Sequence, residues 1–134
     1  MESTLFNITR DHGTIYLDPK AKHEQTLIFL HGLGDSSEGF FDVFAEQPMV
    51  PATCRVVLPT APKKAVSCNN GYKMNSWFDI YNLSGTPNSL SEIRKEYNQD
   101  ELKESVKFLI ELIRTETSKF SDKDSGRVFI GGFS

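Results

Sequence analysis

Three short apolar runs constrain the fold of this chain more than any other sequence feature. They are TLIFL at residues 26–30, RVVLP at residues 55–59 and RVFIGG at residues 127–132. Each is apolar almost throughout rather than alternating with polar residues, which is typical of strands buried on both faces of a parallel sheet. Segments with helical signals lie between the runs, so the order of elements is that of an α/β fold. We therefore expect a mostly parallel sheet with helices on both faces.

Two further elements are indicated at the start of the chain and before the last apolar run. Residues 5–9 and 14–17 are β-prone and are separated by RDHG, whose Asp and Gly favour turns, so we expect an N-terminal β-hairpin. Asn98 precedes a long helix whose early acidic residues suit the positive end of a helix dipole. Apolar side chains recur at helical spacing and predict a face that packs on the sheet: Leu102, Val106, Leu109, Ile110 and Ile113.

The length and composition fit a single globular domain over residues 1–134. Hydrophobic residues make up 38% of the chain and charged residues 25%, which is ordinary for a folded protein. The net charge is −3 and no Lys/Arg-rich stretch is present, which argues against a nucleic-acid-binding protein. Neither a signal peptide nor a run of about 18 apolar residues is present, so we expect a cytoplasmic protein without a transmembrane segment. Cys54 and Cys68 match no zinc-site spacing, so we expect reduced thiols and no bound metal.

The stretch FLHGLGDSSEGF at residues 29–40 leaves an apolar run and enters a helix that we expect to begin near Ser36. Gly32 and Gly34 allow backbone N–H groups to turn toward a ligand, and the start of the helix adds a positive dipole end. This arrangement favours an oxyanion hole. An ordinary Gly-rich loop between a strand and a helix would explain the same residues.

The sequence GGFS at residues 131–134 contains the beginning of a second motif. A nucleophile elbow is a strand that runs into Gly-x-Ser-x-Gly at a sharp turn, and Gly132, Phe133 and Ser134 match its first three positions. A strand that merely ends in glycines is the alternative. Taken together, a Gly-rich loop after one buried strand and Gly-x-Ser after a later one occur in the order of an α/β-hydrolase.

These motifs give the chain a resemblance to a known family. FLHGLGDSSEGF, LPTAPKKAVSCNNGYKMNSWFDIYNL and RVFIGGFS, in this order and at similar spacing, resemble the acyl-protein thioesterase and carboxylesterase family of α/β-hydrolases. The resemblance covers residues 26–134. Relative to the family, the chain is incomplete and stops at the nucleophile serine, so the triad Asp and His have no counterpart in it.

The resemblance implies roles for individual residues. Ser134 corresponds to the nucleophile, and the backbone N–H of Leu33 corresponds to one donor of the oxyanion hole. In the family the second donor is the residue after the serine. Trp77 and Phe78 in NSWFD match an aromatic pair that borders the acyl-binding region, although a core aromatic would also explain Trp77. Asp79 is expected to cap or brace this loop.

Other residues invite a catalytic interpretation. An α/β-hydrolase triad runs in the order Ser, then Asp or Glu, then His, so a catalytic histidine should follow Ser134. We therefore expect His31 to orient the Gly-rich loop through a hydrogen bond, and we expect His12 and His23 at the surface. The stretch GDSS also allows a Gly-Asp-Ser esterase in which Ser36 is the nucleophile, whereas a helix N-cap is the simpler interpretation of Ser36.

The resemblance implies a serine hydrolase that cleaves acyl thioesters or carboxylic esters. Its substrate would be an acylated protein or a lipid ester such as a lysophospholipid. This chemistry needs no metal and no organic cofactor. We expect no nucleic-acid partner, and transient contact with a membrane surface would fit an acylated substrate. The alternative is a non-catalytic truncated fragment, because nothing after Ser134 supplies the triad acid and base.

Overall fold

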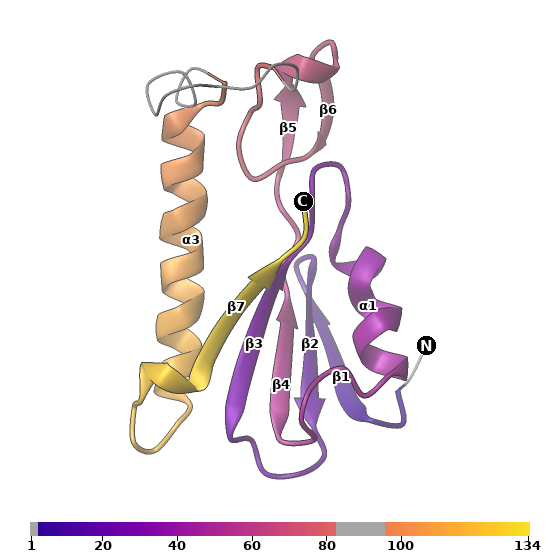
Figure 1. Cartoon of the computed structure of the whole chain (residues 1–134), viewed down its shortest axis with the longest axis vertical. Helices are drawn as coiled ribbons and strands as arrows, with labels where there is room; N and C mark the ends of the chain where they lie inside the picture. The colour runs from indigo at the N-terminus through magenta and orange to yellow at the C-terminus, as the bar shows by residue number, and fades with distance from the viewer. Residues whose placement is uncertain (1–2, 83–95) are drawn as a thin grey trace.

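The computed structural model describes residues 3–82 and 96–134, and its centre is a five-stranded sheet (Figure 1). The strand order is β1-β2-β4-β3-β7. The strands are β1 (Phe6–Asp11), β2 (Thr14–Pro19), β3 (Gln25–Leu30), β4 (Cys54–Leu58) and β7 (Val128–Gly132). β3 pairs in parallel with both β4 and β7. The prediction that the three apolar runs form parallel strands of one sheet is therefore confirmed.

The predicted N-terminal hairpin is also present and makes the sheet mixed. β1 and β2 are antiparallel, and Asp11 faces Thr14 across a two-residue turn. His12 and Gly13 in this turn have φ angles of 47° and 83°, as the tight turn between two twisted strands requires. β2 then pairs antiparallel with β4. The α/β prediction holds, with parallel pairing over β4, β3 and β7 and an antiparallel hairpin at one edge.

Two helices cover opposite faces of the sheet, as predicted. They are α1 (Ser37–Glu46) and α3 (Gln99–Ser118). Neighbouring side chains of a strand point to opposite faces, and β3 shows which helix lies on which face. The ring of Phe29 packs on α1, with centroids 4.8 Å from Phe40 and 5.3 Å from Phe44. Thr26 faces the other way and donates a hydrogen bond to Glu116 of α3.

The main hydrophobic core lies between the sheet and α1. Its buried members come from the hairpin, from α1 and from β4: Phe6, Ile15, Leu17, Phe41, Phe44, Ala45, Val56 and Leu58. Each fully buried side chain of this size contributes about 1.5–3 kcal/mol relative to the exposed state. This core therefore fixes the hairpin and α1 on the parallel strands.

Helix α3 begins as predicted but is less buried than its apolar face indicates. The side chain of Asn98 accepts a hydrogen bond from the backbone N–H of Glu101 at 3.1 Å and caps the first turn. Val106 and Ile110 are 46% and 41% exposed. The prediction that the whole apolar face packs on the sheet is thus wrong for these two residues.

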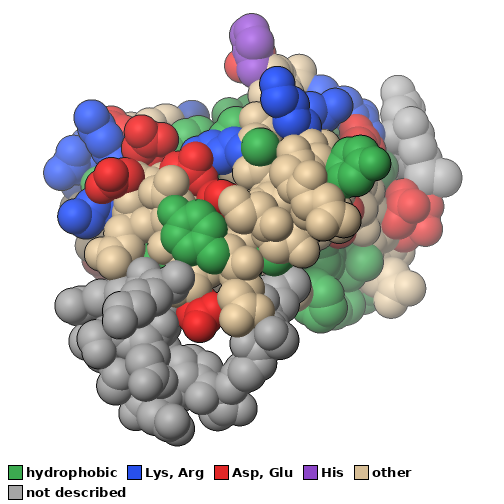
Figure 2. Space-filling view, turned by 90° about the horizontal axis from the view of Figure 1, so that it is seen from above, with side chains coloured by type: hydrophobic (Ala, Val, Ile, Leu, Met, Phe, Trp, Pro, Cys, Tyr) green, Lys and Arg blue, Asp and Glu red, His purple; other side chains and the backbone are tan. Residues whose placement is uncertain are grey.

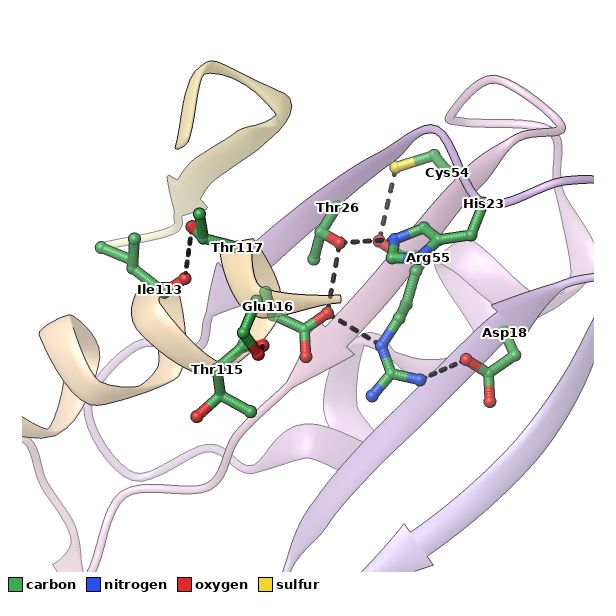
Figure 3. Close-up of polar contacts among 10 residues, drawn as sticks. Asp18, His23, Thr26, Cys54, Arg55, Ile113, Thr115, Glu116 and Thr117 are labelled. Atoms are coloured by element: carbon green, nitrogen blue, oxygen red, sulfur yellow. Dashed lines mark hydrogen bonds and ion pairs between the residues drawn. The ribbon is translucent and has the colours of Figure 1, made fainter. Parts of the chain in front are cut away.

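A polar cluster connects α3 to three strands of the sheet (Figure 3). Glu116 is buried, and its Oε1 accepts hydrogen bonds from Arg55 Nε at 2.9 Å and from Thr26 Oγ1 at 3.2 Å. Arg55 also pairs with Asp18 on β2. His23 Nε2 lies 2.8 Å from Thr26 Oγ1, and burial lowers the pKa of this imidazole. The expectation of a plain surface histidine at position 23 is therefore wrong.

A second, two-stranded sheet follows β4 and was not predicted. It pairs β5 (Lys63–Val66) with β6 (Tyr72–Asn75) in antiparallel orientation, around the short helix η1 (Ser67–Asn69). Asn70 and Gly71 turn the chain with φ angles of 56° and 76°. The β5–β6 hairpin lies beyond the carboxyl ends of β3 and β7, where the chain ends (Figure 1). A second short helix, η2 (Ser125–Arg127), precedes β7.

The surface at this end of the molecule carries mixed charge. In the space-filling view from above, Lys and Arg side chains are interspersed with Asp and Glu, and single hydrophobic side chains lie between them (Figure 2). Among the helices that the structure describes, none combines the length and the apolar character needed to cross a bilayer.

Candidate active site

The Gly-rich loop, residues 31–35, and the end of β7 lie side by side because their strands are parallel neighbours. The register places Phe29 opposite Gly131 and Leu30 opposite Gly132. One residue further on, the backbone N–H of Phe133 donates a hydrogen bond to the carbonyl oxygen of Leu30 at 3.1 Å. The carboxyl ends of parallel strands meet at one edge of a sheet, which is where α/β folds place their ligands.

Gly32 makes the closest approach between the two segments. A Cβ atom at position 32 would lie 2.9 Å from the carbonyl oxygen of Phe133 and 3.1 Å from the Cβ of Ser134. Only a residue without a side chain allows this spacing, so Gly32 is required for reasons of space. The structure thus brings together the loop and the serine that the sequence singled out separately.

Ser134 has the backbone geometry of a residue in a sharp turn. Its φ angle is 58°, in the left-handed region that residues other than glycine seldom adopt, and its side chain is exposed. A nucleophile elbow holds its serine in such a strained conformation. Leu33 directly follows Gly32, and its backbone N–H is paired with no acceptor among residues 3–82 and 96–134.

His31 is buried at the start of the Gly-rich loop, and both of its ring nitrogens are occupied. Nδ1 donates to the carbonyl oxygen of Gly32 at 2.7 Å, and Nε2 accepts from the backbone N–H of Ala61 at 2.9 Å. These contacts fix the tautomer with the proton on Nδ1. His31 therefore orients the loop, as the sequence predicted, and has no nitrogen left to take a proton from a serine.

Trp77 contacts the Gly-rich loop, and Phe78 shares an apolar hollow with Trp77. The indole N–H of Trp77 donates to the carbonyl oxygen of His31 at 2.9 Å, and the Trp77 ring lies 5.2 Å from the His31 ring. Both aromatic residues line an almost entirely apolar hollow of about 230 Å³ between the end of β3 and α3. Its other walls include Leu30, Leu102, Val106 and Leu109.

Asp79 braces the segment that carries these aromatics, as expected. Its carboxylate accepts hydrogen bonds from the backbone N–H of Ser67 at 2.7 Å and from the Ser67 hydroxyl at 2.5 Å. Its own backbone N–H donates to Glu101 of α3. Asp79 is therefore occupied in holding the loop against the first turn of α3.

The sequence analysis did not identify Asn75, which contacts the Gly-rich loop from the end of β6. Its Nδ2 donates to the carbonyl oxygen of Asp35 at 2.8 Å, and its backbone carbonyl accepts from the N–H of Gly34 at 2.9 Å. An isolated asparagine has no sequence signature. The contact depends on the β5–β6 hairpin, which was itself not predicted.

Ser36 occupies the N-cap position of α1, in agreement with the simpler interpretation of this residue, although its hydroxyl makes no capping hydrogen bond. Asp35 accepts the backbone N–H of Ser36 at 2.8 Å. No hydrogen bond joins the Ser36 hydroxyl to any of the three histidines, whose ring nitrogens bond elsewhere: His12 to Asp11, His23 to Thr26, and His31 as described above. The structure thus offers no base for the Gly-Asp-Ser alternative in its described part.

Ser134 likewise has no hydrogen bond to a histidine of the described residues. The described residues supply a candidate nucleophile and a candidate donor loop, whereas no histidine among them contacts the serine. Within these ranges, no three His, Cys, Asp or Glu side chains gather in a way that could hold a metal ion. Cys54 is buried, and burial raises the pKa of its thiol to about 11, so it is a poor candidate nucleophile.

Comparison with known proteins identifies the family of this chain. Residues 14–134 match the phospholipase/carboxylesterase family. The chain is 37% identical over 118 residues to acyl-protein thioesterase 1 of Cryptococcus neoformans, covering 88% of this chain and 47% of that protein. It is 38% identical over 129 residues to acyl-protein thioesterase 1 of Mycosarcoma maydis, covering 90% of this chain and 52% of that protein.

Solved structures show the same relationship. Acyl-protein thioesterase 2 of Zea mays superposes with a TM-score of 0.64 at 26% identity, covering 90% of this chain and 46% of that one. The chain spans about half the length of the curated relatives it matches. The α/β-hydrolase resemblance inferred from the motifs is confirmed by a match over nearly the whole chain, and this chain belongs to the phospholipase/carboxylesterase family.

Proposed function

We propose that this chain carries the nucleophile and one oxyanion donor of a serine hydrolase that cleaves acyl thioesters or carboxylic esters. The observation that carries the proposal is the approach of Gly32 to Ser134, with 3.1 Å between a Cβ at position 32 and that of the serine. Membership of the family and the names of the relatives support the same reaction class.

The proposed chemistry begins with attack of Ser134 Oγ on the acyl carbon. The negative charge that develops on the acyl oxygen would be stabilised by the backbone N–H of Leu33, and removal of such a donor typically costs about 100- to 1,000-fold in kcat. The carbon–sulfur or carbon–oxygen bond of the substrate breaks, and the leaving thiol or alcohol takes up the proton that Ser134 gives up. Water then attacks the acyl-serine, which releases the acid and restores the Ser134 hydroxyl. No metal or organic cofactor takes part in these steps.

The substrate is proposed to carry an apolar acyl chain. The hollow of about 230 Å³ beside Trp77 and Phe78 is almost entirely apolar, which suits an alkyl chain. We place both residues in the acyl-binding region. An acylated protein is the first candidate substrate because the relatives are acyl-protein thioesterases. Lysophospholipids, a cytoplasmic location and transient contact with a membrane surface are further parts of this proposal.

The test uses the complete product of the gene that encodes this chain. We expect it to hydrolyse a palmitoyl thioester and a p-nitrophenyl ester, and Ser134→Ala should abolish both activities, since loss of a catalytic serine costs about 10⁶-fold. Ser36→Ala is the matched control and should retain activity. A product with no Ser134-dependent turnover would refute the proposal and favour the non-catalytic fragment.

A further inference from the structure

The segment formed by β6 and NSWFD contacts both ends of the Gly-rich loop, residues 31–35. We infer that Asn75 and Trp77 are positioning residues that hold this loop in the conformation in which the Leu33 N–H can face an oxyanion. The inference rests on the proposed function for its catalytic consequence, whereas the contacts themselves are properties of the fold.

Trp77 holds the first end of the loop. Its indole N–H donates to the backbone carbonyl of His31 at 2.9 Å, and its ring lies 5.2 Å from the imidazole. His31 is in turn fixed by the backbone N–H of Ala61. The carbonyl and the side chain of His31 are therefore both constrained, and a change at Trp77 acts on the loop through His31.

Asn75 holds the second end of the loop. Its side-chain amide donates to the carbonyl oxygen of Asp35 at 2.8 Å, and its backbone carbonyl accepts the N–H of Gly34 at 2.9 Å. Two consecutive residues of the loop are thus bound by one residue. Leu33 lies between these two points of attachment and makes no backbone hydrogen bond to another described residue.

Within the loop, the carbonyl oxygen of Gly32 accepts hydrogen bonds from the Asp35 N–H and from His31 Nδ1, whereas Leu33 itself is held by neither bond. Gly32 and Gly34 flank Leu33, and glycine loses more conformational freedom on folding than any other residue. Gly34 adopts a φ angle of 81°. A catalytic donor that moves by about 1 Å can lose about 100-fold in rate. Contacts that restrict residues 31–35 therefore determine how well the Leu33 N–H is placed.

The first experiment examines the loop in the complete gene product. Amide hydrogen exchange is measured at Gly34 and Asp35 in the unmodified protein, in Asn75→Ala and in Trp77→Phe, with Lys73→Ala as a control on the same strand. Asn75→Ala keeps the backbone carbonyl that accepts the Gly34 N–H and removes the amide that binds the Asp35 carbonyl, so faster exchange at Gly34 reports opening of the loop. We expect this exchange to accelerate at least tenfold while amides of β3 keep their rates, because the opening is local. Unchanged exchange at Gly34 would overturn the inference.

An NMR measurement tests the hydrogen bond between Trp77 and His31. Trp77 is the only tryptophan in residues 1–134, and comparison with Trp77→Phe assigns its indole N–H resonance in a nitrogen-proton correlation spectrum of the complete gene product. We expect this proton to exchange slowly with water, because it is bound to the His31 carbonyl. Fast indole exchange in the unmodified protein would show that the hydrogen bond is absent and would overturn the role of Trp77.

The second experiment uses the complete gene product and separates positioning from substrate contact. Asn75→Ala should lower kcat by about 10- to 100-fold and leave KM nearly unchanged, as expected when only transition-state stabilisation is lost. Trp77 also lines the proposed acyl-binding hollow, so Trp77→Phe should lower kcat by the same factor for acetyl and palmitoyl substrates and raise KM for the palmitoyl substrate only. A loss confined to KM that grows with acyl length would assign Trp77 to acyl binding alone.

The two experiments fail in different ways. If the unmodified gene product hydrolyses no ester or thioester, the proposed function is wrong, and the exchange data still decide whether Asn75 and Trp77 hold the loop. If hydrolysis is present and Asn75→Ala loosens Gly34 with no change in kcat, the loop does not need this support for catalysis. That second result would overturn the inference alone.

Discussion

Substituting Gly32 by alanine tests the central feature of the site, the close approach of the Gly-rich loop to Ser134. The added Cβ would lie 2.9 Å from the Phe133 carbonyl oxygen, whereas ordinary contacts begin at 3.4 Å. The two backbones must therefore separate by about 0.5 Å, although Gly32 and Phe133 lie within two residues of the paired ends of β3 and β7. Overpacking of this kind costs about 1–3 kcal/mol.

The expected consequence for chemistry is larger than that for stability. Separation of the loop from the serine displaces the Leu33 N–H, and we expect kcat of the complete gene product to fall by about 100-fold. The labelling rate of Ser134 with a fluorophosphonate should fall in parallel. Gly71→Ala is the control, because position 71 has a strained φ of 76° but nothing within 4 Å. A folded Gly32→Ala protein with unchanged kcat and labelling would refute the reasoning.

Three further predictions follow from single contacts. A fluorophosphonate should modify Ser134 and spare Ser36, and peptide mapping decides between them. Glu116→Gln should lower the free energy of unfolding by about 3 kcal/mol in a urea titration, because it leaves the Arg55 guanidinium, which is only 12% exposed, without one of its carboxylates. Burial lowers the pKa of His23 in the folded state, so the unfolded chain takes up the proton first below about pH 6.5. The free energy of unfolding should fall from pH 7.5 to pH 5.5, and His23→Gln should reduce this fall.

Exposed residues of the same types provide the controls for these measurements. Glu111→Gln alters a carboxylate that is 63% exposed and should change the free energy of unfolding by less than about 1 kcal/mol. His12→Gln alters a side chain that is 95% exposed and should leave the pH dependence as it was. Equal effects of the buried and exposed substitutions would contradict the role of burial.

The parallel strands could be predicted because their local pattern and their environment agree. Residues 26–30 and 55–59 are mostly apolar on both faces, which is typical of strands in a sheet covered on both sides. The expectation of burial is wrong for residues 127–132, because β7 lies at the edge of the described sheet and Phe129 and Ile130 are 55% and 50% exposed. Asn98 could be assigned as a cap because its oxygen bonds within the next turn. Ser134 and the Gly-rich loop were found for the same reason, since each motif is contiguous in the sequence.

What escaped prediction depends on contacts between distant segments. The apolar stripe of α3 predicted which face of the helix is buried, yet the buried residue of α3 is Glu116. Its partners are Arg55 and Thr26, which come from two strands. The β5–β6 hairpin was missed although Asn70 and Gly71 form a frequent hairpin turn pair. Asn75 could be recognised only once this hairpin was in place.

The geometry of the candidate site depends on the packing of one core side chain. Phe29 packs against Phe40 and Phe44 of α1, and Gly131 lies opposite it on β7, where a Cβ would come within 3.1 Å of the Phe29 ring. The space that Gly131 leaves for the Phe29 ring favours the observed register between β3 and β7. A slip of one residue would turn every β7 side chain to the other face of the sheet. The same register pairs β3 with β7 up to their last residues, which brings Ser134 beside Gly32. The packing of Phe29 therefore sets the position of Ser134, the proposed nucleophile, relative to the Gly-rich loop.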